Sequence, residues 1–178
     1  MAEAHAERGG FQVRSRTASW ALERAYVVAP LALRLTTGTV FLVHGLQKLL
    51  ALPAAAQGME AMGVRPGMLF AVLVGIIEGV GGAALILGFF TRLAAFGNFV
   101  VQFVALLVVH LPNGFFLNWA NTPGKGHGIE FNLVNLGSLF ALMVLGGGAI
   151  SVDHAMHRKD RMETRRVEVP STRGGTRV

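Results

Sequence analysis

The sequence contains no cysteine among its 178 residues. A disulfide framework, an internal thiol relay and a cysteine-ligated iron–sulfur cluster are therefore excluded for this chain. Charged residues are also scarce, at 15% of the chain, whereas 52% of the residues are hydrophobic. We find no nucleotide-binding glycine loop, no zinc-ligand spacing and no nucleophile triad, and the sequence predicts no metal site. The interpretation of the sequence therefore rests on its long apolar runs.

The few charges are mostly basic and lie near the two ends of the chain. The formal net charge is +6, and the segment after Asp153 alone holds seven Lys and Arg residues. This distribution is typical of the cytoplasmic flanks of a membrane protein, so we expect no nucleic-acid partner. Residues 1–18 and 153–178 are predicted to be disordered cytoplasmic segments on either side of one domain at residues 19–152.

Four apolar runs within this domain predict an all-α integral membrane four-helix bundle. We expect spans at residues 31–50, 67–90, 93–111 and 130–150. The second run is 24 residues long, and at about 1.5 Å per residue a helix of that length crosses the ~30 Å hydrocarbon core. Residues Ser19–Val28 either form a short interfacial helix before the first span or extend that span.

The distribution of basic residues also predicts the orientation. Arginines lie before the first span, and Arg92 lies in the short link between the second and third spans. The two other connections hold only Arg65 and Lys125. Both termini are therefore predicted to be cytoplasmic, in a multi-pass protein that contacts the lipid bilayer.

A polar pocket is expected in the outer half of the bundle, around the mid-membrane Glu78. A charge at this depth costs roughly 2.5–3.5 kcal/mol unless it is compensated. Counted along the helices, His44 and then Lys48 lie nearest in depth to Glu78, whereas Arg34 lies about 13 Å away and is either a snorkelling or a structural residue. The predicted pocket residues are His44, Lys48, Glu78, His110 and Glu130.

Small and amide side chains are expected to hold the helices together. Gly75 and Gly82 share one face of the second span, and Gly137 and Gly148 share one face of the fourth. We expect both faces to pack against other helices. Asn98 and Gln102, four residues apart in the third span, are interpreted as structural polar residues rather than ligands.

Four motifs resemble those of the DoxX family of small membrane proteins. They are VHGLQKL in the first span, IEGVGGAALILGFFTR in the second, GIEFN at the start of the fourth and GGGAISVD at its end. The resemblance covers residues 31–153 and implies a redox-associated protein of the inner membrane with four transmembrane helices. Some members are subunits of thiosulfate:quinone oxidoreductase, and others are membrane partners of redox or thiol-stress systems. The resemblance identifies no catalytic residue.

Three functions are compatible with these residues. The first is a quinone-interacting redox subunit, in which His44 or Lys48 donates to the quinone and Glu78 or Glu130 carries protons. Electrons would then come from a redox partner protein, a bound cofactor or a substrate at the outer face. A haem between His44 and His110 is disfavoured by their ~7 Å difference in depth. The second is a non-catalytic scaffold or assembly partner, and the third is a small-solute or proton-coupled carrier, which would require a homo-oligomer.

Overall fold

The structure is a computed structural model that describes the backbone of residues 2–159 and the side chains of residues 24–159. Every regular element in that part of the chain is helical, which confirms the predicted all-α fold. The elements are α1 (Ala2–Leu50), α2 (Leu52–Ala61), α3 (Gly67–Leu87), α4 (Thr91–Ala105), the π-helical turn η1 (Leu106–His110), the 3-10 turn η2 (Leu111–Asn113) and α5 (Glu130–Leu145).

Three helical segments are long and apolar enough to cross a membrane: Arg24–Leu50, Gly67–Leu87 and Thr91–Asn113. The third of these continues from α4 through η1 and η2. The predicted fourth span corresponds to α5, which has 16 residues and is therefore only about 24 Å long. It ends at Leu145 instead of Ile150 because the chain after it contains three consecutive glycines, of which Gly146 and Gly148 adopt positive φ angles.

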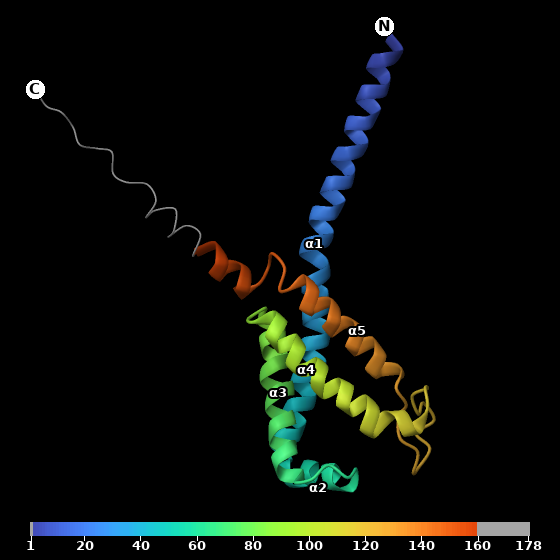
Figure 1. The fold of residues 1–178 in the computed structure, drawn as a ribbon, viewed down its shortest axis with the longest axis vertical. Helices are drawn as coiled ribbons and strands as arrows, with labels where there is room; N and C mark the ends of the chain where they lie inside the picture. Colours follow the sequence, from blue (N-terminus) through green and yellow to red (C-terminus); the bar gives the residue numbers. More distant parts are fainter. Residues whose placement is uncertain (1, 160–178) are drawn as a thin grey trace, which may run out of the picture.

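The helices form two pairs that diverge toward one end of the bundle (Figure 1). α1 and α3 run side by side, while α4 and α5 lie next to each other and cross them at an angle. The short helix α2 and the 114–128 loop lie at the end of the bundle away from the N-terminus, here named the loop end. The 88–90 turn and the segment after α5 lie at the opposite, terminal end.

The two ends of the domain differ from the sequence prediction. α1 is continuous from Ala2, so residues 2–18 are helical where disorder was predicted, and Ser19–Val28 extend the first span. Pro30 lies inside α1, where it removes one helical hydrogen bond; its fully buried ring packs against Gly148, which offsets that loss. Residues 152–159 are also helical, within the predicted disordered tail. Residues 160–178 lie outside the described part.

Arg34 caps the C-terminus of α3. Its side chain is only 2% exposed, and it donates hydrogen bonds to the carbonyls of Leu85 and Ile86, both at 2.8 Å. The last carbonyls of a helix lack partners within the helix and carry partial negative charge, which a cation compensates. Arg34 also donates to the carbonyls of Gly147 at 2.7 Å and Ile150 at 2.5 Å. It is therefore a structural residue that ties three segments together, and it does not snorkel.

Asp153 caps the next helix, α4, with the opposite charge. Its carboxylate accepts hydrogen bonds from the backbone N–H groups of Phe90 at 2.7 Å and Thr91 at 2.9 Å. Its own N–H donates to the carbonyl of Gly88. An anion at a helix N-terminus satisfies free N–H groups and compensates the helix dipole. The α3–α4 turn is thus fixed by Arg34 on one side and Asp153 on the other.

Glycines bring α1 and α3 into backbone contact. A Cβ on Gly82 would lie 2.3 Å from the Leu42 nitrogen, and a Cβ on Gly45 would lie 2.1 Å from the Gly79 nitrogen. Gly75 is covered by the side chain of Leu49, which a Cβ would meet at 2.8 Å. The predicted packing face of the second span is therefore found, with Gly45 as a partner from the first span.

The predicted packing face of α5 is wrong at Gly137. This glycine is exposed, and no heavy atom of the described residues lies within 4 Å of the position of its Cβ. Helix α5 turns other residues inward, and Leu139 and Leu142 pack into the core with Phe41, Leu85 and Ala95. Gly148 does pack closely, but in the segment after α5 instead of on a helix face.

Asn98 packs between α4 and α3, as predicted for a structural amide. It is fully buried, its Nδ2 donates to the carbonyl of Ala94 at 2.9 Å, and a Cβ on Gly81 would lie 2.4 Å from that nitrogen.

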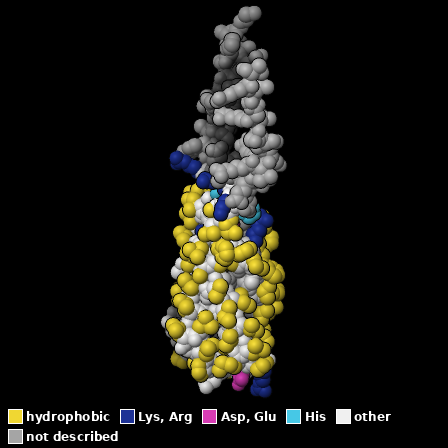
Figure 2. All heavy atoms as spheres, turned by 90° about the vertical axis from the view of Figure 1, so that its left-hand side faces the viewer, with side chains coloured by type: hydrophobic (Ala, Val, Ile, Leu, Met, Phe, Trp, Pro, Cys, Tyr) yellow, Lys and Arg dark blue, Asp and Glu magenta, His cyan; other side chains and the backbone are white. Residues whose placement is uncertain are grey.

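The outside of the bundle is apolar. Figure 2 shows hydrophobic side chains covering the described part of one face, with basic side chains at its two ends. Such a surface is suited to lipid contact.

Candidate functional site

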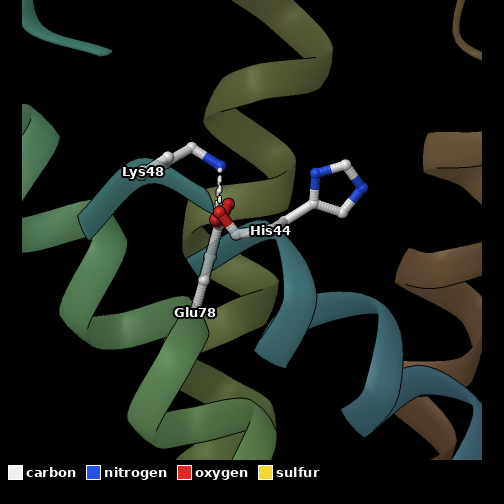
Figure 3. Close-up of polar contacts among 3 residues, drawn as sticks. All are labelled: His44, Lys48 and Glu78. Carbon is white, nitrogen blue, oxygen red and sulfur yellow. Dashed lines mark hydrogen bonds and ion pairs between the residues drawn. The ribbon is translucent and has the colours of Figure 1, made fainter. Parts of the chain in front are cut away.

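Glu78 forms an ion pair with Lys48 across α1 and α3. The Lys48 Nζ lies 2.5 Å from the Glu78 Oε2 (Figure 3). The side chain of Glu78 is 8% exposed and that of Lys48 is 24% exposed. Lys48 is one of the two partners predicted for Glu78, so the compensation expected for a mid-membrane carboxylate is present.

The glycine contact between the two helices explains why this pair forms. Glu78 directly precedes Gly79, whose backbone touches Gly45, and Lys48 follows Gly45 by three residues. Residues three apart on a helix lie on the same face. The close approach of the backbones therefore places the lysine and the carboxylate within reach of each other.

His44 does not contact Glu78. Its imidazole ring points away from the ion pair (Figure 3), and its side chain is exposed. Its backbone carbonyl accepts a long hydrogen bond of 3.5 Å from the Lys48 Nζ. His44, the partner ranked first from the sequence, is therefore a neighbour of the ion pair, and it lines the adjoining cavity.

A cavity of about 620 Å³ opens beside the ion pair, where the two helix pairs diverge. Its wall includes residues of α1, α3, α4 and α5, with α2 and the 114–128 loop at the loop end. Most lining side chains are apolar, and a small number of polar groups converge on the space. This combination is typical of small-molecule sites. The polar residues in the wall are His44, Lys48, Glu78, Gln102, His110, Asn118, Asn121, His127, Asn132 and Asn135.

The cavity is also bordered by partly exposed apolar side chains. Phe70, Val104 and Val108 line it and are 36%, 49% and 42% exposed, respectively. An apolar wall of this kind suits the apolar part of a lipophilic ligand.

His110 lies in the cavity wall, as predicted, and connects it to the 114–128 loop. Its Nδ1 lies 2.9 Å from the carbonyl oxygen of His127. A carbonyl only accepts, so this nitrogen carries the proton and Nε2 is the acceptor in the neutral ring. The Nδ1 of His127 in turn accepts a hydrogen bond from the Asn118 nitrogen at 3.2 Å. The loop is thus cross-linked over the cavity.

Glu130 is not in the cavity wall, which corrects its predicted role. Its carboxylate accepts a hydrogen bond from the Leu117 nitrogen at 3.2 Å, and its own nitrogen donates to the carbonyl of Phe115 at 2.9 Å. Glu130 starts α5, where a carboxylate is favoured by the helix dipole. It therefore anchors the loop at the edge of the site and does not face a ligand.

Five carboxamides in the cavity wall were not predicted as pocket residues: Gln102, Asn118, Asn121, Asn132 and Asn135. Gln102 was interpreted as structural, but its half-buried side chain lines the cavity. Asn132 and Asn135 are 2% and 5% exposed and line the cavity from α5. The sequence feature that could have predicted Asn132 and Asn135 is their spacing of three residues, which places two asparagines on one face of an apolar helix.

Chemically, the cavity offers groups of different kinds. Lys48 only donates hydrogen bonds, the Glu78 carboxylate only accepts them, and the amides and imidazoles do both. Within residues 24–159 we find no group of three or more His, Asp or Glu side chains arranged to hold a metal ion. The arrangement is suited to a small organic molecule with oxygen functions and an apolar body.

Sequence comparisons identify the family. Residues 29–111 match the DoxX family model. An uncharacterised protein of Haemophilus influenzae is 33% identical over 71% of this chain and 90% of its own length. The inner membrane protein YqjF of Escherichia coli is 31% identical over 74% of this chain and 95% of its own length.

An uncharacterised membrane protein of Mycobacterium tuberculosis is 31% identical over 72% of this chain and 82% of its own length. No solved structure is significantly similar to this chain. The similarity to these relatives extends well beyond the segment matched by the family model, and it agrees with the apolar helices of the fold. The chain is therefore an inner-membrane protein that belongs to the DoxX family.

Proposed function

We propose that this protein is a quinone-interacting membrane subunit of a redox system, and that the cavity is its quinone site. The observation that carries the proposal is the position of the Lys48–Glu78 pair in the wall of a 620 Å³ cavity. Ionisable residues within membrane spans are costly and mark functional sites by default. A pair used only for packing would have no need of an adjoining cavity.

The residues in the wall fit a quinone. The ring needs hydrogen-bond donors for its oxygens, and Lys48, His44 and Asn132 can provide them. Its faces need apolar contacts, which Val40, Phe41 and Val74 offer. The isoprenoid tail needs a path to the bilayer, and the partly exposed apolar residues Phe70, Val104 and Val108 would line such a path.

When bound, the quinone would supply a two-electron, two-proton redox couple, with electrons from a partner redox protein. The chain's own contribution is to bind the ring, to exclude water and to hold a proton beside it. The Lys48 Nζ can donate to a ring oxygen, and the Glu78 carboxylate can accept and release a proton. Because Glu78 is almost fully buried, its proton exchange would be confined to the cavity.

A non-catalytic scaffold is the second candidate, and one observation favours it. The Lys48 Nζ already reaches the Glu78 Oε2 directly, without a ligand between them. Such a pair can fix the register of α1 against α3 without taking part in chemistry. The scaffold would then serve a redox or stress-response enzyme in the same membrane.

A double-mutant cycle distinguishes the two candidates. We expect Lys48→Met to lower the free energy of unfolding by about 3 kcal/mol, because the Glu78 carboxylate is left buried and unpaired. Adding Glu78→Gln should restore most of this loss, since the amide carries no charge. Thermal unfolding of the purified variants measures both effects.

The second measurement of the cycle is a redox phenotype in cells that lack the chromosomal gene for this protein and express each variant instead. A quinone site predicts that the refolded double variant stays inactive, because an amide cannot carry a proton at neutral pH. Full activity of the stable double variant would support the scaffold and contradict the quinone site. If the effects of the two substitutions simply add, both on stability and on the redox phenotype, Lys48 and Glu78 do not interact.

We also propose that both termini are cytoplasmic and that the loop end faces outward. The basic residues support this orientation, because the loop end carries few of them. The cavity would then lie in the outer half of the membrane, with the 114–128 loop above it.

A further inference from the structure

Three carboxamides form one side of the cavity, here named the amide wall: Gln102 of α4 and Asn132 and Asn135 of α5. The Lys48–Glu78 pair approaches the same space from α1 and α3. The cavity thus has a charged side and a neutral polar side, each on a different helix pair.

Asn132 is the informative member of this wall. Its side chain is 2% exposed, yet it makes no hydrogen bond with any of the described residues. Among the described residues, the buried side-chain atoms without a hydrogen-bond partner are Thr91 Oγ1 and Asn98 Oδ1, so the Asn132 amide is not sealed off but open to the cavity that it lines. Asn98 differs, because it is wedged between two helices and does not line the cavity. The position of Asn132 in the cavity wall leaves its amide free to bind a ligand there.

The amide group suits a ligand that changes its hydrogen-bonding character. A quinone oxygen only accepts hydrogen bonds, whereas the hydroxyl of the corresponding quinol also donates one. A carboxamide has an NH₂ donor and a carbonyl acceptor. Asn132 can therefore serve both forms, while Lys48 can only donate and the Glu78 carboxylate can only accept.

We infer that Asn132, with Gln102 in the wall of the same cavity, binds one ring oxygen of a tailed quinone in both its oxidised and its reduced form. This inference rests on the proposed quinone site and names the residues that hold the ring on the side of α4 and α5. Asn135 contributes less, because its Nδ2 already donates to the carbonyl of Phe131 at 3.2 Å.

The structure predicts an unusual signature for Asn132→Leu, which keeps the side-chain size and removes the amide. No internal hydrogen bond is lost, so the melting temperature of the ligand-free protein should stay equal or rise. Binding of the ring should weaken, since its hydrogen-bond partner is gone. Residues kept for function often show this opposition between stability and binding.

The experiment uses the full chain in detergent, with Trp119 as the reporter. Trp119 lines the cavity, and Trp20→Phe removes the other tryptophan of the sequence. Short-tail ubiquinone-1 is titrated to quench the fluorescence, and ubiquinol-1 is added in competition. We expect Asn132→Leu to weaken both affinities about tenfold, as for one lost hydrogen bond. Ser138→Ala, on α5 but outside the cavity wall, is the control and should change neither affinity.

The outcomes separate this inference from the proposed function. If the parent protein binds ubiquinone-1 and Asn132→Leu binds it equally well, the amide is solvated by water and the inference is wrong, while the quinone site stands. A lower melting temperature or failure to fold would make Asn132 a structural amide and would also overturn it. Loss of affinity for only one redox form would contradict recognition of both. No quenching in the parent protein would overturn the proposed function itself.

Discussion

At the scale of single residues, the buried charges of this protein divide into two groups with different surroundings. Arg34 donates four hydrogen bonds to backbone carbonyls. Lys48 and Glu78 satisfy each other and border a cavity. The first arrangement fixes the fold, whereas the second leaves room for a ligand.

This difference predicts that Arg34 is needed for stability. Arg34→Met should lower the free energy of unfolding by about 3 kcal/mol, because buried carbonyls at the end of α3 lose their charged donor. Arg34→Lys should recover only part, since an ammonium group cannot match the planar fork of the guanidinium. Thermal unfolding in detergent measures both variants.

The control for this prediction is Arg92→Met. Arg92 makes one long hydrogen bond of 3.3 Å to the carbonyl of Val144 and is exposed, so its loss should cost much less. Equal melting temperatures for Arg34→Met and Arg92→Met would contradict the capping role of Arg34.

Sequence reasoning found the charged half of the site and missed the neutral half. Glu78 could be predicted because a lone carboxylate in a long apolar run demands a partner. Depth along the helices pointed first to His44 and then to Lys48, and it is Lys48 that forms the ion pair. Amides give no such signal, because they are common as helix-packing residues in membranes. Gln102 and Asn132 were therefore separable from Asn98 only once the cavity was located.

At the scale of helices, the glycines are not equivalent. Gly82 lies against the backbone of α1, whereas Gly137 faces outward with no described atom near its Cβ position. The two cannot be distinguished from sequence, since both belong to stripes of small residues with helical spacing. The divergence of α5 from the other helices, which leaves Gly137 uncovered, depends on tertiary packing.

The same substitution should therefore have opposite effects at these two positions. Gly82→Ala should destabilise the protein, because a Cβ would lie 2.3 Å from the Leu42 nitrogen and force α1 and α3 apart. Gly137→Ala should be neutral or stabilising by up to about 1 kcal/mol through higher helix propensity. Melting temperatures of the two variants provide the test, and similar values would refute the close α1–α3 contact.

At the scale of the whole molecule, the two ends of the bundle are built differently. At the terminal end, Arg34 and Asp153 fix the α3–α4 turn through hydrogen bonds. At the loop end, the helix pairs diverge around a cavity, and residues of the 114–128 loop line that cavity. The sequence predicted the helices and their order but not this divergence, because each amphipathic pattern specifies a buried face and not the angle at which helices cross.

The orientation of this molecule can be tested by cysteine labelling, since the chain has no native cysteine. Gln57 and Thr122 are exposed at the loop end, and Arg158 is exposed at the terminal end. We expect single cysteines at positions 57 and 122 to react with an impermeant maleimide in spheroplasts, and one at position 158 to react only after lysis. The reverse pattern would place the cavity in the inner half of the membrane.

The central claim is that the cavity holds a quinone, and quinone content of the purified protein tests it most directly. Val101 lines the cavity, whereas its neighbour Val100 is 45% exposed and lies outside the cavity wall. We predict that the parent protein and Val100→Phe retain quinone in the extract, whereas Val101→Phe loses most of it because the larger side chain fills the site. A parent protein without quinone, or equal quinone content in the two phenylalanine variants, would contradict the account.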